Sequence, residues 1–304
     1  MIPLDPAAGF RDTLVAEICY ALGASRRGLV HGLLSPLLRR PIGRLARIAA
    51  SADAEIEAGG LSGAARRILP DLSMRPSVRG VERIPSEGPL LVVSNHPGGF
   101  DSVAILACLP RRDIKVVLSD APLTRAFVAA RRYFVFAPLT ASGGAAALRA
   151  CVRHLRSGGA VLVFANGDVE PDPELGREDA LPFRDWSRSV EIMLREVSET
   201  RLQMVMASGV LLPKYLRNPL VRIRKTNVRR QKLAEVLQIL HQVLKPGSVR
   251  LRPHLSFAEP VRAGDLDACV LLPSVIDLAR DLLAEHRAAL GRTSGPLDGG
   301  FRSL

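Results

Sequence analysis

The sequence has few aromatic residues and no long apolar run. Aromatics make up 4% of 304 residues, which argues against the stacked side chains that bind single-stranded nucleic acid. No apolar segment approaches the ~20 residues that span a bilayer. The N-terminus lacks the basic start and apolar core of a signal peptide. We therefore expect no membrane span, so that any contact with a membrane would be made at its surface.

Cysteines are also scarce, and the four lie far apart at Cys19, Cys108, Cys151 and Cys269. No two of them have the spacing of zinc ligands or of a redox pair. We expect reduced thiols packed as small apolar residues, which suits a cytoplasmic setting, and no metal site. The sequence has no Gly-x-Ser-x-Gly elbow either, so no protein nucleophile is evident.

Positive charge, in contrast, is in excess, with 42 Lys+Arg against 30 Asp+Glu and a net charge of +12. Such an excess faces water or an anionic partner, such as nucleic acid, an anionic membrane or a phosphorylated substrate. Six arginines and no acidic residue lie between Arg26 and Arg47, interleaved with Leu, Val and Ile. This pattern suits an amphipathic segment on a membrane surface. It suits equally a helix pair that covers the sheet with solvated arginines.

Along the rest of the chain, short apolar runs alternate with longer segments whose apolar residues recur at helical spacing. Gly and Pro turns separate them. This alternation predicts an α/β fold in which a mostly parallel central sheet is flanked by helices, after an N-terminal amphipathic helical segment. Predicted strands are 90–93, 114–118, 133–136, 160–164, 203–212 and 249–257, and predicted helices are 11–24, 28–50, 54–69, 102–109, 123–132, 142–156, 187–200, 232–244 and 266–290. We expect three parts, an N-terminal segment 1–77, an α/β domain 78–290 and a flexible tail 291–304.

The stretch from Leu90 to Ser102 holds the strongest chemical signal. A buried strand ends in Asn95-His96, a Pro-Gly-Gly turn follows, and Asp101 opens a helix. A carboxylate at a helix N-terminus is favoured by the helix dipole. It can bind one imidazole nitrogen and leave the other free as a base. His96 and Asp101 are therefore a candidate catalytic pair, although a plain turn with an N-capping aspartate has the same residues.

Residues 84–96, followed by Asp101, resemble the first block of the glycerolipid acyltransferases, which include the lysophosphatidic acid and glycerol-3-phosphate acyltransferases. The resemblance covers about residues 78–212. It implies transfer of a fatty acyl group from acyl-CoA or an acyl carrier protein, as co-substrate without another cofactor, to a lipid hydroxyl. His96 would be the general base and Asp101 its orienting partner. It also implies phospholipid biosynthesis at the inner face of a membrane with anionic lipids.

The later blocks depart from the family pattern. Ala137 stands where the second block has arginine, and Asn166 and Val169 replace the glutamate and arginine of the third block. Those arginines are associated with the phosphate of the acceptor, so the acceptor is left unassigned. Arg131 and Arg132, or Lys214 and Arg217, could substitute from another direction.

We interpret eight further residues as candidate substrate-binding residues near the His-Asp pair. They are Asn95, Gly98, Gly99, Arg131, Arg132, Asn166, Gly167 and Asp168, with the backbone amides of the glycines as candidate oxyanion donors. Two other hypotheses remain open, a non-catalytic lipid- or membrane-binding protein of the same fold and a nucleic-acid-binding protein. We favour the acyltransferase, without nucleic acid as a partner, because nucleic-acid binding does not explain the His-Asp turn. The oligomeric state is not predicted.

Overall fold

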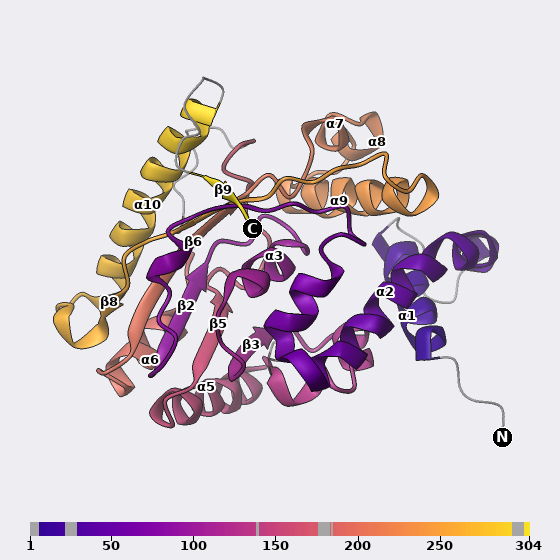
Figure 1. The fold of residues 1–304 in the computed structure, drawn as a ribbon. Helices are drawn as coiled ribbons and strands as arrows, with labels where there is room; N and C mark the ends of the chain where they lie inside the picture. Colours follow the sequence, from indigo (N-terminus) through magenta and orange to yellow (C-terminus); the bar gives the residue numbers. More distant parts are fainter. Residues whose placement is uncertain (1–5, 22–28, 138–139, 176–182, 184, 294–300) are drawn as a thin grey trace.

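The fold is a nine-stranded sheet with helices on both faces, seen in a computed structural model (Figure 1). The structure describes residues 6–21, 29–137, 140–175, 183, 185–293 and 301–304. The strand order is β4-β3-β5-β2-β6-β7-β1-β9, and β8 pairs with β6. The strands are β1 Ser77–Arg79, β2 Leu90–Ser94, β3 Ile114–Leu118, β4 Phe134–Phe136, β5 Ala160–Phe164, β6 Arg201–Ser208, β7 His254–Phe257, β8 Val261–Arg262 and β9 Arg302–Ser303.

Strand β2 lies inside the sheet, parallel to both of its neighbours. Leu90 to Ser94 pair with Ala160 to Phe164 of β5 and with Arg201 to Val205 of β6. Antiparallel pairing occurs between β6 and β7, between β6 and β8, and between β1 and β9. The predicted α/β class with a mostly parallel sheet is therefore confirmed. The carboxyl ends of β2, β5 and β6 meet at one edge, where open α/β sheets gather their ligands.

Alternate residues of the buried strands feed two separate cores. Leu90 and Val92 face a core built with α2 and α3, whereas Leu91 and Val93 face a core built with α5, α6 and α10. All four side chains are fully buried, as expected for a parallel strand covered on both faces. The helices are α1 Pro6–Ala21, α2 Leu29–Ile68, α3 Asp101–Cys108, α4 Pro122–Ala126, α5 Ala141–Arg156, α6 Arg188–Glu196, α7 Pro213–Leu216, α8 Pro219–Arg222, α9 Asn227–Leu244 and α10 Leu271–Thr293.

The N-terminal helices pack against each other and form a third core. Ile42 and Ala46 of α2 are fully buried against Phe10, Val15 and other residues of α1. The apolar face of α2 around Ile42 and Ala46 is therefore covered by protein. The two predicted helices 28–50 and 54–69 form one element, interrupted at Gly60, whose φ of 65° is in the left-handed region that glycine adopts without strain.

Some predicted elements differ from the observed ones. The helix predicted at 123–132 is the short α4 followed by a 3₁₀ turn at Ala130–Tyr133. Asp53 binds the backbone amides of residues 128–130, so these amides do not continue a helix. Of the strand predicted at 249–257, the structure has β7 and an isolated bridge between Leu251 and Met74, separated by Pro253, which lacks the N–H that pairing needs. Of the tail predicted to be flexible, residues 294–300 lie outside the described residues, while Arg302–Ser303 pair with β1.

Candidate active site

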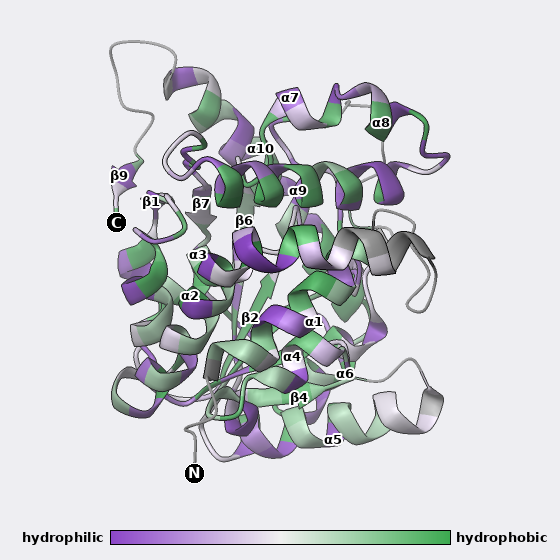
Figure 2. Cartoon of the chain, turned by 90° about the vertical axis from the view of Figure 1, so that its right-hand side faces the viewer, coloured by the Kyte–Doolittle hydropathy of each residue, from purple (hydrophilic) through white to green (hydrophobic). Residues whose placement is uncertain are grey.

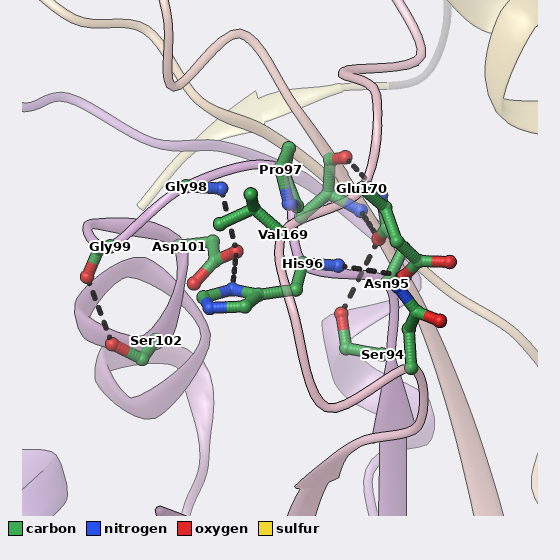
Figure 3. Close-up of polar contacts among 12 residues, drawn as sticks. Ser94, Asn95, His96, Pro97, Gly98, Gly99, Asp101, Ser102, Val169 and Glu170 are labelled. Carbon is green, nitrogen blue, oxygen red and sulfur yellow. Dashed lines mark hydrogen bonds and ion pairs between the residues drawn. The ribbon is translucent and has the colours of Figure 1, made fainter. Parts of the chain in front are cut away.

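His96 and Asp101 meet across the turn that follows β2 (Figure 3). The Nδ1 atom of His96 lies 2.8 Å from Oδ2 of Asp101, which also accepts a hydrogen bond from the backbone N–H of Gly98. Asp101 is the first residue of α3 and is fully buried. The side chain of His96 is 23% exposed. In the neutral tautomer that this contact favours, Nδ1–H donates to Asp101 and Nε2 is left with an open lone pair.

Asn95 fixes the end of β2 to β6. Its side-chain amide donates to the carbonyl of Ala207 at 2.9 Å and accepts from the N–H of Ala207 at 2.8 Å. The residue is 1% exposed, so both polar groups of the amide are used inside the protein. This geometry favours a structural role for Asn95 over the substrate contact that the sequence predicted.

Glu170 holds the backbone of His96 from the loop after β5. Its N–H donates to the carbonyl of His96 at 2.7 Å, and its carboxylate accepts from the N–H of His96 at 3.1 Å. The indole N–H of Trp186 donates to the other carboxylate oxygen at 3.1 Å. Burial raises the pKa of Glu170 to about 7, although both hydrogen bonds oppose this shift. Glu170 is therefore a positioning residue, which is buried and holds the backbone of His96.

Helix α9 supplies the other wall of the site. Gln231 donates to the carbonyls of Pro97 and Glu170, both at 2.6 Å. Glu235 accepts a hydrogen bond from the N–H of Gly99. These residues were not predicted from the sequence. The signal was present, because Gln231, Glu235 and Gln238 share one helix face by their spacing and interrupt its apolar pattern with polar groups.

Carboxylates outnumber cations around His96. Burial lowers the pKa of His96, but Asp101, Glu235 and Glu170 raise it, and the net pKa lies above the ordinary value. Asp168 also lies within electrostatic range of the imidazole. Lys232 is paired with Asp168 at 2.7 Å. The imidazole can therefore hold a proton in this acidic surrounding more readily than a histidine in water.

The predicted loop residues and arginines divide into two groups. Asn166, Gly167 and Asp168 follow β5 at the same sheet edge as His96, and Lys232 holds Asp168 there. Arg131 and Arg132 lie in the turn before β4, at the amino end of an outer strand. Arg131 donates to the carbonyl of Arg125, and Arg132 lies over the ring of Tyr133. Within the described residues, no hydrogen bond or ion pair joins either arginine to the His-Asp pair.

The three glycine amides predicted as oxyanion donors already have acceptors. The N–H groups of Gly98 and Gly99 donate to Asp101 and Glu235. The N–H of Gly167 donates to the carbonyl of Phe164 at 3.0 Å. In this state none of the three is free to bind a developing oxyanion, and Gly99 becomes a donor only if the Glu235 carboxylate moves away.

The part of the chain that the structure describes holds neither a metal-binding cluster nor a membrane-spanning helix. In that part, no three His, Cys, Asp or Glu side chains are grouped to hold a metal ion. None of its helices is long and apolar enough to cross a bilayer.

Comparison with known proteins agrees with the resemblance seen in the sequence. Residues 75–190 match the protein-family model described as Acyltransferase. No curated protein matches the chain. A solved structure, the 1-acyl-sn-glycerophosphate (LPA) acyltransferase PlsC from Thermotoga maritima, is similar with 18% identity and a TM-score of 0.48, over 93% of this chain and 95% of that one. The family match spans the turn with His96 and Asp101 and the loop with Glu170.

Proposed function

We propose, from the match of residues 75–190 to the acyltransferase model, that this protein transfers a fatty acyl group from an acyl thioester to a hydroxyl of a lipid or lysolipid. The observation that carries the proposal is the 2.8 Å contact between His96 and the buried Asp101 at the carboxyl end of β2. A carboxylate in this position holds the imidazole in the tautomer whose second nitrogen accepts a proton. The catalytic domain in this proposal extends over residues 78–290.

The reaction needs one base and no covalent intermediate on the protein. Nε2 of His96 takes the proton of the acceptor hydroxyl, and the oxygen attacks the thioester carbonyl. A new C–O bond forms, the C–S bond breaks, and the imidazolium returns its proton to the departing thiolate. Asp101 stabilises the imidazolium between these two steps. Glu170 and Gln231 act through the backbone of the turn, which they hold in place.

The charges around His96 favour an acceptor without a phosphate monoester. Asp101, Asp168, Glu170 and Glu235 surround the imidazole, whereas Arg131 and Arg132 belong to the other end of an outer strand. A dianionic phosphate near these carboxylates would be repelled. We predict that a lysophospholipid with a phosphodiester headgroup is acylated at least about tenfold faster, in kcat/KM, than lysophosphatidic acid. Comparable rates in competition assays would contradict this prediction.

Transfer of a radiolabelled acyl group by the purified protein tests the function itself. The activity should disappear in His96→Ala, while the variant keeps the circular dichroism spectrum and melting temperature of the unmodified protein. A non-catalytic lipid-binding protein of the same fold is the alternative, favoured by Ala137, Asn166 and Val169 in place of the family residues. It predicts lipid binding without any acyl transfer. Transfer that survives in folded His96→Ala would exclude the proposed mechanism.

We place the enzyme on the cytoplasmic face of a membrane, as a peripheral protein. The net charge of +12 and the lipid nature of the proposed acceptor support this location.

A further inference from the structure

Residues 213–226, which we call the α7–α8 segment, form an outer layer beyond α9 (Figures 1 and 2). Two large aliphatic side chains in it face solvent, Leu220 at 60% and Ile223 at 75% exposure. Val221, between them, is fully buried, and Tyr215 is 6% exposed. The segment therefore has an inner side anchored in the main core and an outer side that presents two aliphatic residues.

The α7–α8 segment is held by specific contacts. Asn218 and Thr226 cap the starts of α8 and α9 with their side chains. The guanidinium of Arg230 donates to the carbonyls of Arg222 and Arg224. The hydroxyl of Tyr215 lies 2.8 Å from Nδ1 of His241. Leu220 and Ile223 are thus exposed on an ordered support.

Positive charge surrounds these two aliphatic residues. From Lys214 to Lys232 there are eight basic residues and no acidic one. Figure 2 shows the apolar α8 between hydrophilic stretches on either side. Among the described residues, the exposed side chains of Arg217, Arg222, Lys225 and Arg229 form no ion pair. Single exposed aliphatic residues are ordinary, but here two of them lie close in the chain to four exposed cations for which the described residues supply no ion pair.

We infer that the α7–α8 segment docks on an anionic lipid surface, with Leu220 and Ile223 entering the interface and the surrounding cations meeting the headgroups. Burial of aliphatic side chains together with attraction between cations and anionic lipids is how interfacial segments bind. The inference rests on the proposed function only for the purpose of the docking. The residues that we expect to contact the lipid do not include His96.

The position of the α7–α8 segment relative to the active site supports a lipid partner. The segment leads directly into α9, whose residue 231 bonds the turn after His96. The helix rises 1.5 Å per residue, so Asn227 is only about 6 Å along the axis from Gln231. A membrane against the segment would therefore lie close to the mouth of the site.

Flotation with lipid vesicles, measured without substrate, tests the inference. The full-length protein should float with vesicles of equimolar phosphatidylcholine and phosphatidylglycerol, and much less with phosphatidylcholine alone. Leu220→Ser with Ile223→Ser should lower the partition coefficient by about tenfold or more. Arg222→Gln with Lys225→Gln should lower it by about thirtyfold, since each cation near an anionic surface contributes roughly a factor of five.

Matched controls keep the result specific. Val270→Ser, which removes an aliphatic residue 44% exposed beside α10, should leave vesicle binding unchanged. All variants should keep the melting temperature of the unmodified protein within experimental error. His96→Ala should bind vesicles normally, so a failure of the proposed catalysis is distinguished from a failure of docking.

Three results would overturn the inference. Vesicle binding that both double variants retain would show that another surface docks. Loss of binding in Arg39→Gln with Arg40→Gln alone would place the contact on α2. A steeply salt-dependent affinity for an RNA oligonucleotide or an acidic carrier protein, lost in Arg222→Gln with Lys225→Gln and without vesicle binding, would assign the basic cluster to that partner.

Discussion

Two histidines of this protein show how environment assigns a role to the same side chain. His96 is partly exposed, binds a carboxylate through one nitrogen and has a pKa above the ordinary value. His286 is fully buried and lies 2.8 Å from the hydroxyl of Ser208 through Nε2 and 2.8 Å from that of Ser256 through Nδ1. Burial, with His254 and nearby arginines, lowers its pKa to about 3.

The difference lies in what each ring can do when it gains a proton. His96 has a carboxylate to stabilise the imidazolium and a second nitrogen that reaches toward solvent. Both nitrogens of His286 are occupied, and the effect of burial and of His254 on its pKa outweighs the opposing effect of the Glu174 carboxylate, so a proton there would break the network. His96 is therefore suited to acid–base chemistry, and His286 to joining β6, β7 and α10 as a neutral bridge.

The largest expected effect is the loss of activity in His96→Gln. Removal of a general base lowers the rate by about 10²–10⁴-fold, and we expect kcat to fall by about 10³-fold while the free energy of unfolding changes by less than ~1 kcal/mol. His154→Gln is the matched control, because His154 bonds the carbonyl of Asp113 away from the site. Equal losses of activity in the two variants would remove the distinction between His96 and the structural histidines.

Asp101→Asn should have the next largest effect. The amide can keep a hydrogen bond to the ring but does not stabilise the imidazolium, so we expect kcat/KM to fall by about 10²-fold with little change in substrate KM. The pKa of His96 should also fall, which moves the rising limb of the pH–rate profile to lower pH. Asp277→Asn, at the exposed pair with Arg280, provides the control. An unshifted profile would mean that Asp101 only caps the helix.

His286→Leu should affect stability instead of chemistry. The buried hydroxyl of Ser256 loses its partner, which costs about 2 kcal/mol, while activity per folded molecule stays within about twofold. The pH dependence gives a second test. Because the folded-state pKa is about 3, the unfolded chain binds the proton first as the pH falls below the ordinary histidine pKa.

The depressed pKa of His286 determines how the free energy of unfolding changes with pH. The contribution of neutral His286 to stability is complete at neutral pH and is lost as the pH falls toward 3. Between pH 6 and 4, the titration of His286 lowers the free energy of unfolding by up to ~1.4 kcal/mol for each unit that the pH falls. Urea unfolding at several pH values should show a weaker acid dependence in His286→Leu. An identical slope in both proteins would contradict neutral burial of this ring.

The sequence was sufficient for the parts of the molecule that local patterns determine. The fully apolar Leu90–Val93 run, the Pro-Gly-Gly turn and a following Asp predicted β2, the turn and α3. Their placement in a mostly parallel sheet is confirmed. Arg131 and Arg132 were grouped with the site on charge alone. The sheet places them before β4 instead, because a residue on the amino side of a parallel strand lies at the edge opposite the ligands.

Contacts between distant segments were beyond the sequence pattern. Gln231 and Glu235 reach the His96 turn from more than 130 positions away along the chain. The pattern of α9 indicates a polar face but does not say which loop covers it. His154, His241, His254 and His286 each bind a neighbouring group, and no local pattern in the sequence indicates which group. Such partners depend on strand order, as in the pairing of Ser208 with His254 across β6 and β7.

The smallest expected effect is also the most direct test of the electrostatic difference between the two histidines. Glu235→Gln keeps an oxygen that can accept from Gly99 and removes one of the charges that raise the pKa of His96. The rising limb of the pH–rate profile should therefore move to lower pH, by less than in Asp101→Asn, with kcat on the plateau within about threefold. Glu196→Gln, at the exposed pair with Arg156, should leave the profile in place. A profile that Glu235→Gln does not move would mean that Glu235 does not contribute to the basicity of His96, and that α9 serves the site only through its contacts with the turn.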